Sequence, residues 1–162
     1  MAVDSQVTDR VTVEVLVDAS PETIFEFFTD PEKMVRWKGT AADLDARPGG
    51  VYDVQVTQQA RARGEYVEVE PPARVVFTWG WDGDDDVPPG SSTVEVTLEP
   101  RAESTLVRLV HSGLPESKRA LHREGWEHFT SRLQVAAAGG DPGPDPMLAQ
   151  DNQATWEGDA DG

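Results

Sequence analysis

The sequence predicts an α+β domain in which a curved antiparallel sheet wraps around one long C-terminal helix, with two short helices after the first strand. Strand and turn signals alternate from Gly49 to His111 without a helical pattern between them, as in an antiparallel meander rather than in strand–helix–strand units. A long helical pattern then runs from about Pro115 to Ala138. Because a helix with one apolar face must bury that face, we expect it to cover the sheet.

The chain of 162 residues has the length of one domain with a sizeable core. We assign residues 11–138 to this domain and expect residues 1–10 to be a flexible N-terminus. From Gly139 onward the composition changes to Gly, Pro and acidic residues, without Lys or Arg. Such a segment has little to bury, so residues 139–162 are predicted to be a disordered acidic tail.

The first strand is predicted at residues 11–17, where Val-Thr-Val-Glu-Val-Leu-Val places polar side chains between apolar ones. Ser20 is then placed to cap a short helix, and Pro21 suits its first turn because proline lacks the N–H that would have no partner there. A second short helix is predicted at about residues 31–37, followed by a loop.

Five or six strands fit between Gly49 and His111. The strongest is residues 74–81, where the two-residue period of a strand puts three aromatic side chains, Phe77, Trp79 and Trp81, on the same face. We expect that face to point into the core. The meander strands are predicted at residues 51–57, 64–70, 74–81, 92–99 and 105–111.

The long helix is preceded by His-Ser-Gly-Leu-Pro at residues 111–115. Gly113 permits a backbone bend at no steric cost, and Pro115 suits the first helical turn. Trp126 and His122 are predicted to lie beside the apolar face, where the helix meets the sheet. That face is formed by residues recurring every three or four positions: Leu121, Gly125, Phe129, Leu133 and Ala136.

The charge of the chain limits its partners. A formal net charge of −16 argues against nucleic acid and anionic membranes, because both are bound by clustered Lys and Arg. We therefore predict no direct nucleic-acid partner and no membrane association. The sequence has neither an apolar stretch of about 18 residues nor a hydrophobic run before Val11, so no membrane span or signal peptide is predicted. A cytoplasmic location is the resulting expectation.

The residue patterns of common metal and catalytic centres are missing. The chain has no cysteine, and its three histidines lack the spacing of helical zinc ligands. The acidic turn after Trp81 has Val87 and Thr93 where a calcium-binding EF-hand loop needs glycine and glutamate. No Gly-x-Ser-x-Gly, phosphate-loop or dinucleotide motif is present. We predict no metal, no cofactor and no turnover enzyme.

A series of short motifs follows in order along residues 10–137. They are Ser20-Pro-Glu with Phe25, Thr29-Asp-Pro, Trp37, Arg47-Pro-Gly-Gly, Gly64-Glu-Tyr, Pro72 through Val76-Phe-Thr-Trp, His111-Ser-Gly-Leu-Pro and His122-Arg-Glu-Gly-Trp. With the predicted layout, which is the helix-grip architecture, these motifs resemble the START-like (SRPBCC) superfamily, in the branch similar to the activator of Hsp90 ATPase. That fold hosts lipid carriers, hormone receptors, polyketide cyclases and co-chaperone domains, so the resemblance implies a fold more firmly than a function.

A cavity between a curved sheet and a crossing helix is suited to an apolar or aromatic ligand, and Gly125 would leave room over it. Five tryptophans are more than simple packing requires. For each aromatic residue the alternative is ordinary core packing. The candidate ligand-binding residues are Trp37, Tyr52, Trp79, Trp81, His111, Leu114, Trp126 and Phe129.

Within the branch, the chain most resembles the calicheamicin self-resistance type, which protects the producer of an enediyne antibiotic by sacrificing itself. The resemblance implies a stoichiometric binder in which a glycine gives a hydrogen atom to the activated drug and the backbone is then cut. Gly113, at the cavity-side end of a strand just before the long helix, is the glycine that we predict for this role. Two other functions stay open. One is an Hsp90-activator-like domain with a chaperone partner, and the other is a polyketide cyclase or small hydrophobic-ligand binder with His111 as acid or base.

Overall fold

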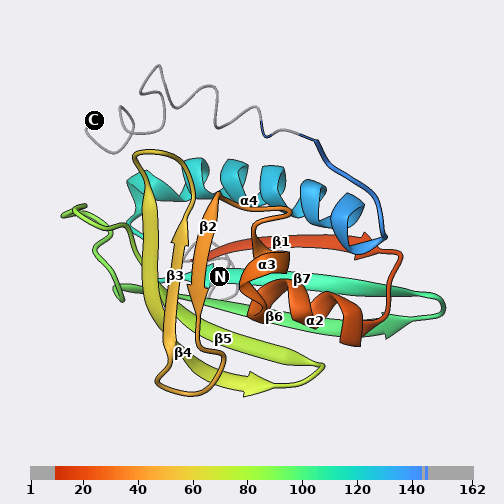
Figure 1. Ribbon diagram of the computed structural model, residues 1–162. Coiled ribbons are helices and arrows are strands. Elements are labelled where there is room, and N and C mark those ends of the chain that lie inside the picture. Colours follow the sequence, from red (N-terminus) through yellow and green to blue (C-terminus); the bar gives the residue numbers. More distant parts are fainter. Residues whose placement is uncertain (1–9, 144, 146–162) are drawn as a thin grey trace, which may run out of the picture.

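The computed structural model describes residues 10–143 and 145. It confirms the predicted α+β helix-grip fold, because one antiparallel sheet curves around a long helix near the C-terminus and two short helices follow the first strand (Figure 1). Residues 1–9, 144 and 146–162 lie outside the description. These ranges hold most of the predicted flexible N-terminus (residues 1–10) and of the predicted disordered tail (residues 139–162), and both stay predictions.

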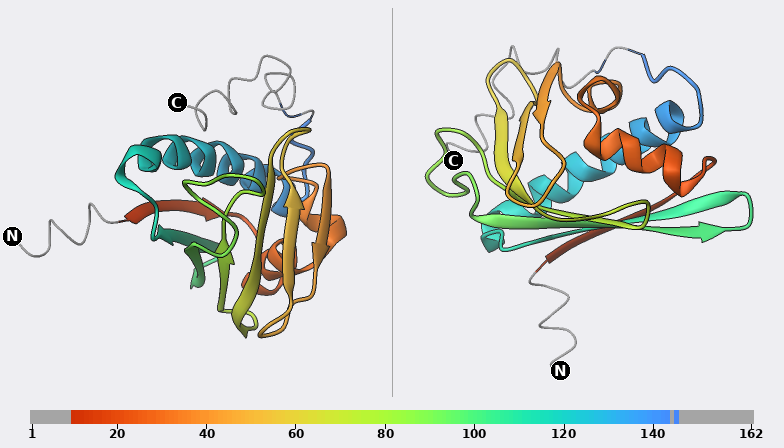
Figure 2. Two further views of the ribbon diagram at one scale, coloured as in Figure 1. Left: turned by 90° about the vertical axis from the view of Figure 1, so that its left-hand side faces the viewer. Right: turned by 60° about the horizontal axis from the view of Figure 1, so that its bottom comes forward.

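The sheet has seven strands in the order β1-β7-β6-β5-β4-β3-β2, and each is antiparallel to its neighbours. From β2 to β7 each strand pairs with the next one along the chain, which makes a simple meander. β1, the first strand of the chain, pairs with β7, the last. Two further views show how strongly the sheet curves (Figure 2). The strands are β1 (Arg10–Val17), β2 (Ala41–Leu44), β3 (Val51–Gln55), β4 (Arg61–Glu70), β5 (Arg74–Trp79), β6 (Ser92–Arg101) and β7 (Ser104–Ser112).

Three helices complete the described fold: α2 (Pro21–Thr29), α3 (Pro31–Met34) and α4 (Glu116–Ala137). Ser20 caps α2 as predicted, since its hydroxyl oxygen accepts a hydrogen bond from the Thr23 backbone N–H at 3.2 Å. The α3 helix is shorter than predicted. In the part of the chain that the structure describes, no helix is both long and apolar enough to cross a bilayer.

The strand prediction missed β2 and placed one boundary late. Four residues with two alanines, Ala-Ala-Asp-Leu, carry almost no strand signal, and β2 forms because it pairs with β3 at the end of the sheet. β4 begins at Arg61 rather than at residue 64, because the polar Arg-Ala-Arg run is stabilised by pairing with β3. The five strands from β3 to β7 otherwise lie where the alternation indicates.

The pairing of β4 with β5 is irregular at one point. The register shifts between Tyr66 and Glu68, and the backbone N–H of Glu65 donates to the Thr78 hydroxyl at 2.9 Å. Gly64 approaches the opposite strand so closely that a β-carbon there would lie 2.0 Å from the Thr78 carbonyl oxygen. A glycine at this position therefore permits the close approach that curves the sheet.

The buried face of α4 is largely the predicted one, since Gly125, Phe129, Leu133 and Ala136 are buried. His122 and Trp126, predicted to lie where the helix meets the sheet, are buried too, whereas Leu121 is only half-buried. Lys118 is also buried, and its Nζ lies 3.7 Å from the Asp86 carboxylate. Aromatic and polar side chains thus occupy the centre of the face, because they have partners on the sheet.

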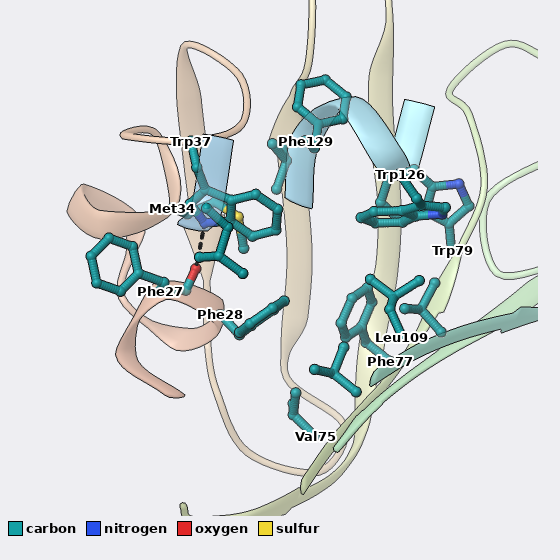
Figure 3. Close-up of a cluster of buried hydrophobic side chains, with 14 of the residues drawn as sticks. Phe27, Phe28, Met34, Trp37, Val75, Phe77, Trp79, Leu109, Trp126 and Phe129 are labelled. Atoms are coloured by element: carbon teal, nitrogen blue, oxygen red, sulfur yellow. Dashed lines mark hydrogen bonds between the residues drawn. The ribbon is translucent and has the colours of Figure 1, made fainter. Parts of the chain in front are cut away.

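The two short helices are anchored to the core by hydrogen bonds from aromatic side chains. The indole Nε1 of Trp37 donates to the Phe27 carbonyl at 3.0 Å, the dashed line in Figure 3. The Tyr66 hydroxyl on β4 donates to the Phe28 carbonyl at 2.8 Å. Both carbonyls belong to the last turn of α2, where backbone oxygens lack helical partners. The bonds therefore fix the end of α2 against the sheet.

Side chains of α4 contact the free side of β1. Arg123 Nη1 donates to the Thr12 carbonyl at 3.1 Å, and Gln134 Nε2 donates to the Leu16 carbonyl at 2.9 Å. β1 and β2 are the two ends of the strand order. Side chains of α4 thus donate hydrogen bonds to backbone carbonyls on the edge of β1 that has no neighbouring strand.

The first tail residues return to the body of the domain. Asp145 is buried, its carboxylate lies 2.7 Å from Nε2 of His128, and it lies 3.8 Å from Nε of Arg132. Arg132 also donates to the carbonyl oxygens of Pro142 and Gly143 at 3.4 and 3.0 Å. The chain therefore stays attached to α4 for several residues beyond the helix.

Replacing Gly64 by alanine is expected to destabilise the fold by roughly 1–3 kcal/mol, because the new methyl group meets backbone that cannot move alone. Urea unfolding of Gly64→Ala measures the loss. Gly83→Ala is the control, since a β-carbon at Gly83 would have nothing within 4 Å and its cost comes from a φ of +81° alone. Equal losses in the two variants would show that the close approach of β4 to β5 is unimportant.

Candidate functional site

A small cavity lies between the sheet and α4. Its volume is about 10 Å³, which is room for a single water molecule. Gly125 borders it from the helix, as predicted for a residue that leaves room over the interior. The remaining lining residues are Lys38, Trp79, Trp81, His122, Trp126 and Phe129.

Trp79 on β5 is the centre of the aromatic cluster. Its ring centroid lies 5.1 Å from that of Trp126, 5.3 Å from that of Trp81 and 5.6 Å from that of His111. Figure 3 shows Trp126 of α4 beside Trp79, with Phe77 of the sheet close by. The interior is thus filled largely by rings from the two layers.

The predicted ligand-binding residues separate into two groups. Trp79, Trp81, Trp126 and Phe129 line the cavity. The others are buried in the surrounding core without lining it, as Tyr52 illustrates: its ring stacks on Phe77 with centroids 4.1 Å apart. These others are Trp37, Tyr52, His111 and Leu114.

Gly113 does not line the cavity. The residue is exposed and follows β7 directly, with a φ of +87° that L side chains rarely adopt. A β-carbon there would lie 3.2 Å from Cα of Ser92 and 3.3 Å from the Ser91 carbonyl oxygen. The glycine that we predicted as hydrogen donor is therefore reached from outside the domain, while its neighbour Leu114 is buried.

Lys38 borders the cavity, although the sequence did not point to it as a site residue. Only 2% of the residue is exposed, and its Nζ has no hydrogen-bond partner within residues 10–143 and 145. The nitrogen lies 4.0 Å from the ring centroid of Trp79, 5.0 Å from that of Trp126 and 5.7 Å from that of Phe129. Burial lowers the pKa of Lys38 well below its usual value, because the charged amine loses its hydration. The sequence signal was weak, since a lysine at the end of a short helix is ordinarily solvated.

His111 joins the sheet to α4 through both ring nitrogens. The Trp126 indole Nε1–H donates to Nδ1 at 2.9 Å, so this nitrogen carries no proton. The other nitrogen, Nε2, lies 2.8 Å from the hydroxyl of Ser92, which itself donates to the Trp79 carbonyl at 2.8 Å. His111 is therefore neutral with its proton on Nε2. Because both ring nitrogens of His111 are already hydrogen-bonded to protein groups, the arrangement favours a structural role for His111 over the role of an acid or base in a cyclase.

His122 repeats the pattern on α4. The Trp81 indole Nε1–H donates to Nε2 of His122 at 2.9 Å, which leaves the ring proton on Nδ1. Nδ1 lies 2.8 Å from the Lys118 carbonyl oxygen and donates to it. Two indole–imidazole hydrogen bonds thus cross the interface between sheet and helix, and each requires a neutral imidazole.

Burial is the main electrostatic influence on both histidines. It lowers the pKa of His111 well below its usual value, and the nearby His122 and Lys38 lower it further by charge repulsion. Burial also lowers the pKa of His122, although the hydrogen bond to Lys118 acts in the opposite direction. Among residues 10–143 and 145, no group of three or more His, Asp or Glu is placed to hold a metal ion.

Comparison with known proteins agrees with this architecture. The profile of the family described as activator of Hsp90 ATPase homolog 1-like protein (AHSA1) matches residues 18–138. The chain belongs to the AHSA1-like family. The resemblance predicted from the motifs is thereby confirmed.

Several solved structures resemble this AHSA1-like chain. An AHSA1-like protein of Rhizobium etli is 48% identical, over 85% of this chain and 87% of its own, with a TM-score of 0.69. DynU16, from the dynemicin biosynthetic locus, is 29% identical over 83% of this chain, with a TM-score of 0.72. The match spans only 49% of DynU16. CalU16 from Micromonospora echinospora is 25% identical, over 94% of this chain and 88% of its own, with a TM-score of 0.66. Among curated proteins, none matches the sequence.

Acidification is expected to destabilise the AHSA1-like domain through its two buried histidines. Their pKa values are lowered in the folded state, so below about pH 6.5 the unfolded chain binds more protons and stability falls as pH falls. The slope should reach at most about 1.4 kcal/mol per pH unit for each histidine.

Urea unfolding between about pH 7.5 and 5.5 measures this slope, because most carboxylates titrate below that window. His122→Gln replaces the ring by an amide that also has a donor and an acceptor but does not titrate. The variant should therefore show a smaller slope of stability against pH. A slope that is the same in the variant would contradict the assignment of His122 as a buried neutral base.

Proposed function

We propose that this protein binds an enediyne antibiotic of the dynemicin and calicheamicin type and is consumed by it, as a stoichiometric resistance protein rather than a turnover enzyme. The observation that carries the proposal is the similarity to DynU16, which comes from the dynemicin biosynthetic locus. Dynemicin is itself an enediyne. The resemblance to the calicheamicin self-resistance type, noted in the motifs, supports the same ligand class.

Gly113 is the proposed reacting residue. An activated enediyne is an aryl diradical, and each radical centre removes a hydrogen atom from an accessible C–H bond. A glycine Cα–H bond is unshielded by a side chain, and the radical left on Cα is stabilised by the flanking amide nitrogen and carbonyl. Molecular oxygen then adds to the carbon radical, and the resulting peroxyl species leads to backbone cleavage. Gly113 suits this chemistry because it is exposed.

The exposure of Gly113 changes the expected binding mode. A cavity of about 10 Å³ is far smaller than an antibiotic, whose pocket would need several hundred Å³. The drug is therefore expected to bind over the junction of β7 and α4, where Gly113 is reached from solvent, or to separate α4 from the sheet. In neither case does Gly113 have to face the interior.

Deuterium transfer tests the proposal. Protein produced with α-deuterated glycine is incubated with calicheamicin and a thiol reductant in air, and both products are analysed by mass spectrometry. We expect deuterium in the aromatised drug and two protein fragments that meet at Gly113, in amounts limited by the drug. Gly113→Ala should lose most of this cleavage, because its Cα–H bond is hindered.

Gly49→Ala is the matched control. Gly49 is also exposed and has a φ of +85°, so alanine meets the same backbone strain away from β7. It should be cleaved like the wild type. Cleavage scattered over several glycines, or undiminished in Gly113→Ala, would reject Gly113 as the hydrogen donor.

The family match supports a second candidate function. The family is described as activator of Hsp90 ATPase homolog 1-like protein, so a chaperone-binding role is the main alternative. Stimulated ATP hydrolysis by Hsp90 on addition of this protein, with no protection of DNA from calicheamicin, would favour that role over the sacrificial one.

A further inference from the structure

The interior contains an amine without a counter-charge. Among the residues that the structure describes, Lys38 Nζ has no hydrogen-bond partner, and burial rather than any nearby charge accounts for the lowered pKa of Lys38. The chain has two other lysines, and both have carboxylate partners: Lys33 pairs with Glu26, and Lys118 lies 3.7 Å from Asp86. Lys38 is the exception, although it is the most deeply buried of the three.

A second donor beside the same cavity is also unpaired. The Trp79 indole Nε1–H is buried and has no hydrogen-bond partner in the described part of the chain, whereas the indoles of Trp37, Trp81 and Trp126 all donate to protein acceptors. Buried donors are almost always paired in native proteins, because an unpaired one costs about 1–3 kcal/mol. Two unpaired donors on residues that line one cavity indicate that the cavity is built for an acceptor.

The surrounding rings do not replace that acceptor. Ring faces attract an ammonium by about 0.5–2 kcal/mol, but burying a charged amine costs several kcal/mol. The rings also accept no conventional hydrogen bond from the Trp79 nitrogen. What would satisfy both donors is an oxygen atom with negative charge, since charge-assisted hydrogen bonds are about twice as strong as neutral ones.

We infer that this cavity receives the anionic oxygen of an aromatic acid, a carboxylate or an acidic phenol, with Lys38 Nζ and Trp79 Nε1 as its donors. The cavity already has room for one such oxygen. Trp81, Trp126 and Phe129 supply apolar surface for an attached ring, which enters as α4 shifts from the sheet at Gly125. This inference goes beyond the sacrificial function and does not depend on cleavage at Gly113.

Matched pairs of small probes test the inference. Benzoate and 1-naphthoate are compared with benzamide and 1-naphthamide, which have nearly the same shape without the charge, by calorimetric titration of the full chain near pH 7. At least one acid should bind about tenfold or more tightly than its amide. In ¹⁵N spectra, that acid and not its amide should shift the Trp79 indole N–H signal.

Lys38→Met should abolish the preference for the acid, since it removes the amine and keeps a similar apolar volume. The variant is expected to fold and to be at least as stable as the wild type, because it no longer buries an unpaired amine. Lys118→Met, which removes a lysine that has its own carboxylate partner, should keep the preference.

Each other outcome overturns the inference. If acid and amide bind equally, the interior is a general apolar pocket, which leaves the proposed enediyne binding intact. If neither acid binds, a structural water satisfies the donors and the cavity takes no anionic ligand. If Lys38→Met keeps the acid preference, the charge is recognised elsewhere.

Discussion

The fold depends on the attachment of α4 to the concave face of the sheet, and this attachment is polar at its centre. Trp126 on the helix bonds to His111 on β7, and Trp81 beyond β5 bonds to His122 on the helix. Hydrophobic burial alone is non-directional and would let a helix slide or rotate on the sheet. The two indole–imidazole bonds have fixed donors and acceptors, so they set the rotation of α4 and place Gly125 over the cavity.

Most of the strands and helices could be predicted from the sequence, because the residue patterns that indicate them lie within short stretches of the chain. Alternation over residues 74–81 placed Phe77 and Trp79 inside, and Ser20 with Pro21 marked the start of α2. The four-residue β2 could not be found, since it exists only through pairing with β3. The helical period placed most of the buried face of α4, but it could not show that Leu121 is only half-buried while the less apolar His122 is buried and bonded to Trp81.

In the candidate site, too, features set by neighbouring residues in the sequence could be predicted, and features set by distant residues could not. Of the predicted aromatic walls, Trp79, Trp81 and Trp126 border the cavity, whereas Trp37 and Tyr52 are buried in the core without bordering it. The buried amine of Lys38 was not predictable, because nothing near it in the sequence distinguishes it from a surface lysine, and only the folded chain brings it against Trp79 and Trp126. Gly113 does follow the end of a strand as predicted, but it is exposed and does not border the cavity, because the chain turns outward there before α4 begins.

The contacts of α4 with β1 bear on how the protein behaves in a crowded cell. An unpaired strand edge is a template for other chains, and open sheets aggregate or swap strands through it. Here Arg123 and Gln134 already bond carbonyls on the free side of β1, while the opposite edge is only the four residues of β2. Growth of the sheet by addition of foreign strands is thereby discouraged at both ends. The cleavage proposed at Gly113 would fall between β7 and α4, so all seven strands would stay in one fragment, which would lose the covalent link to the helix that bonds the edge of β1.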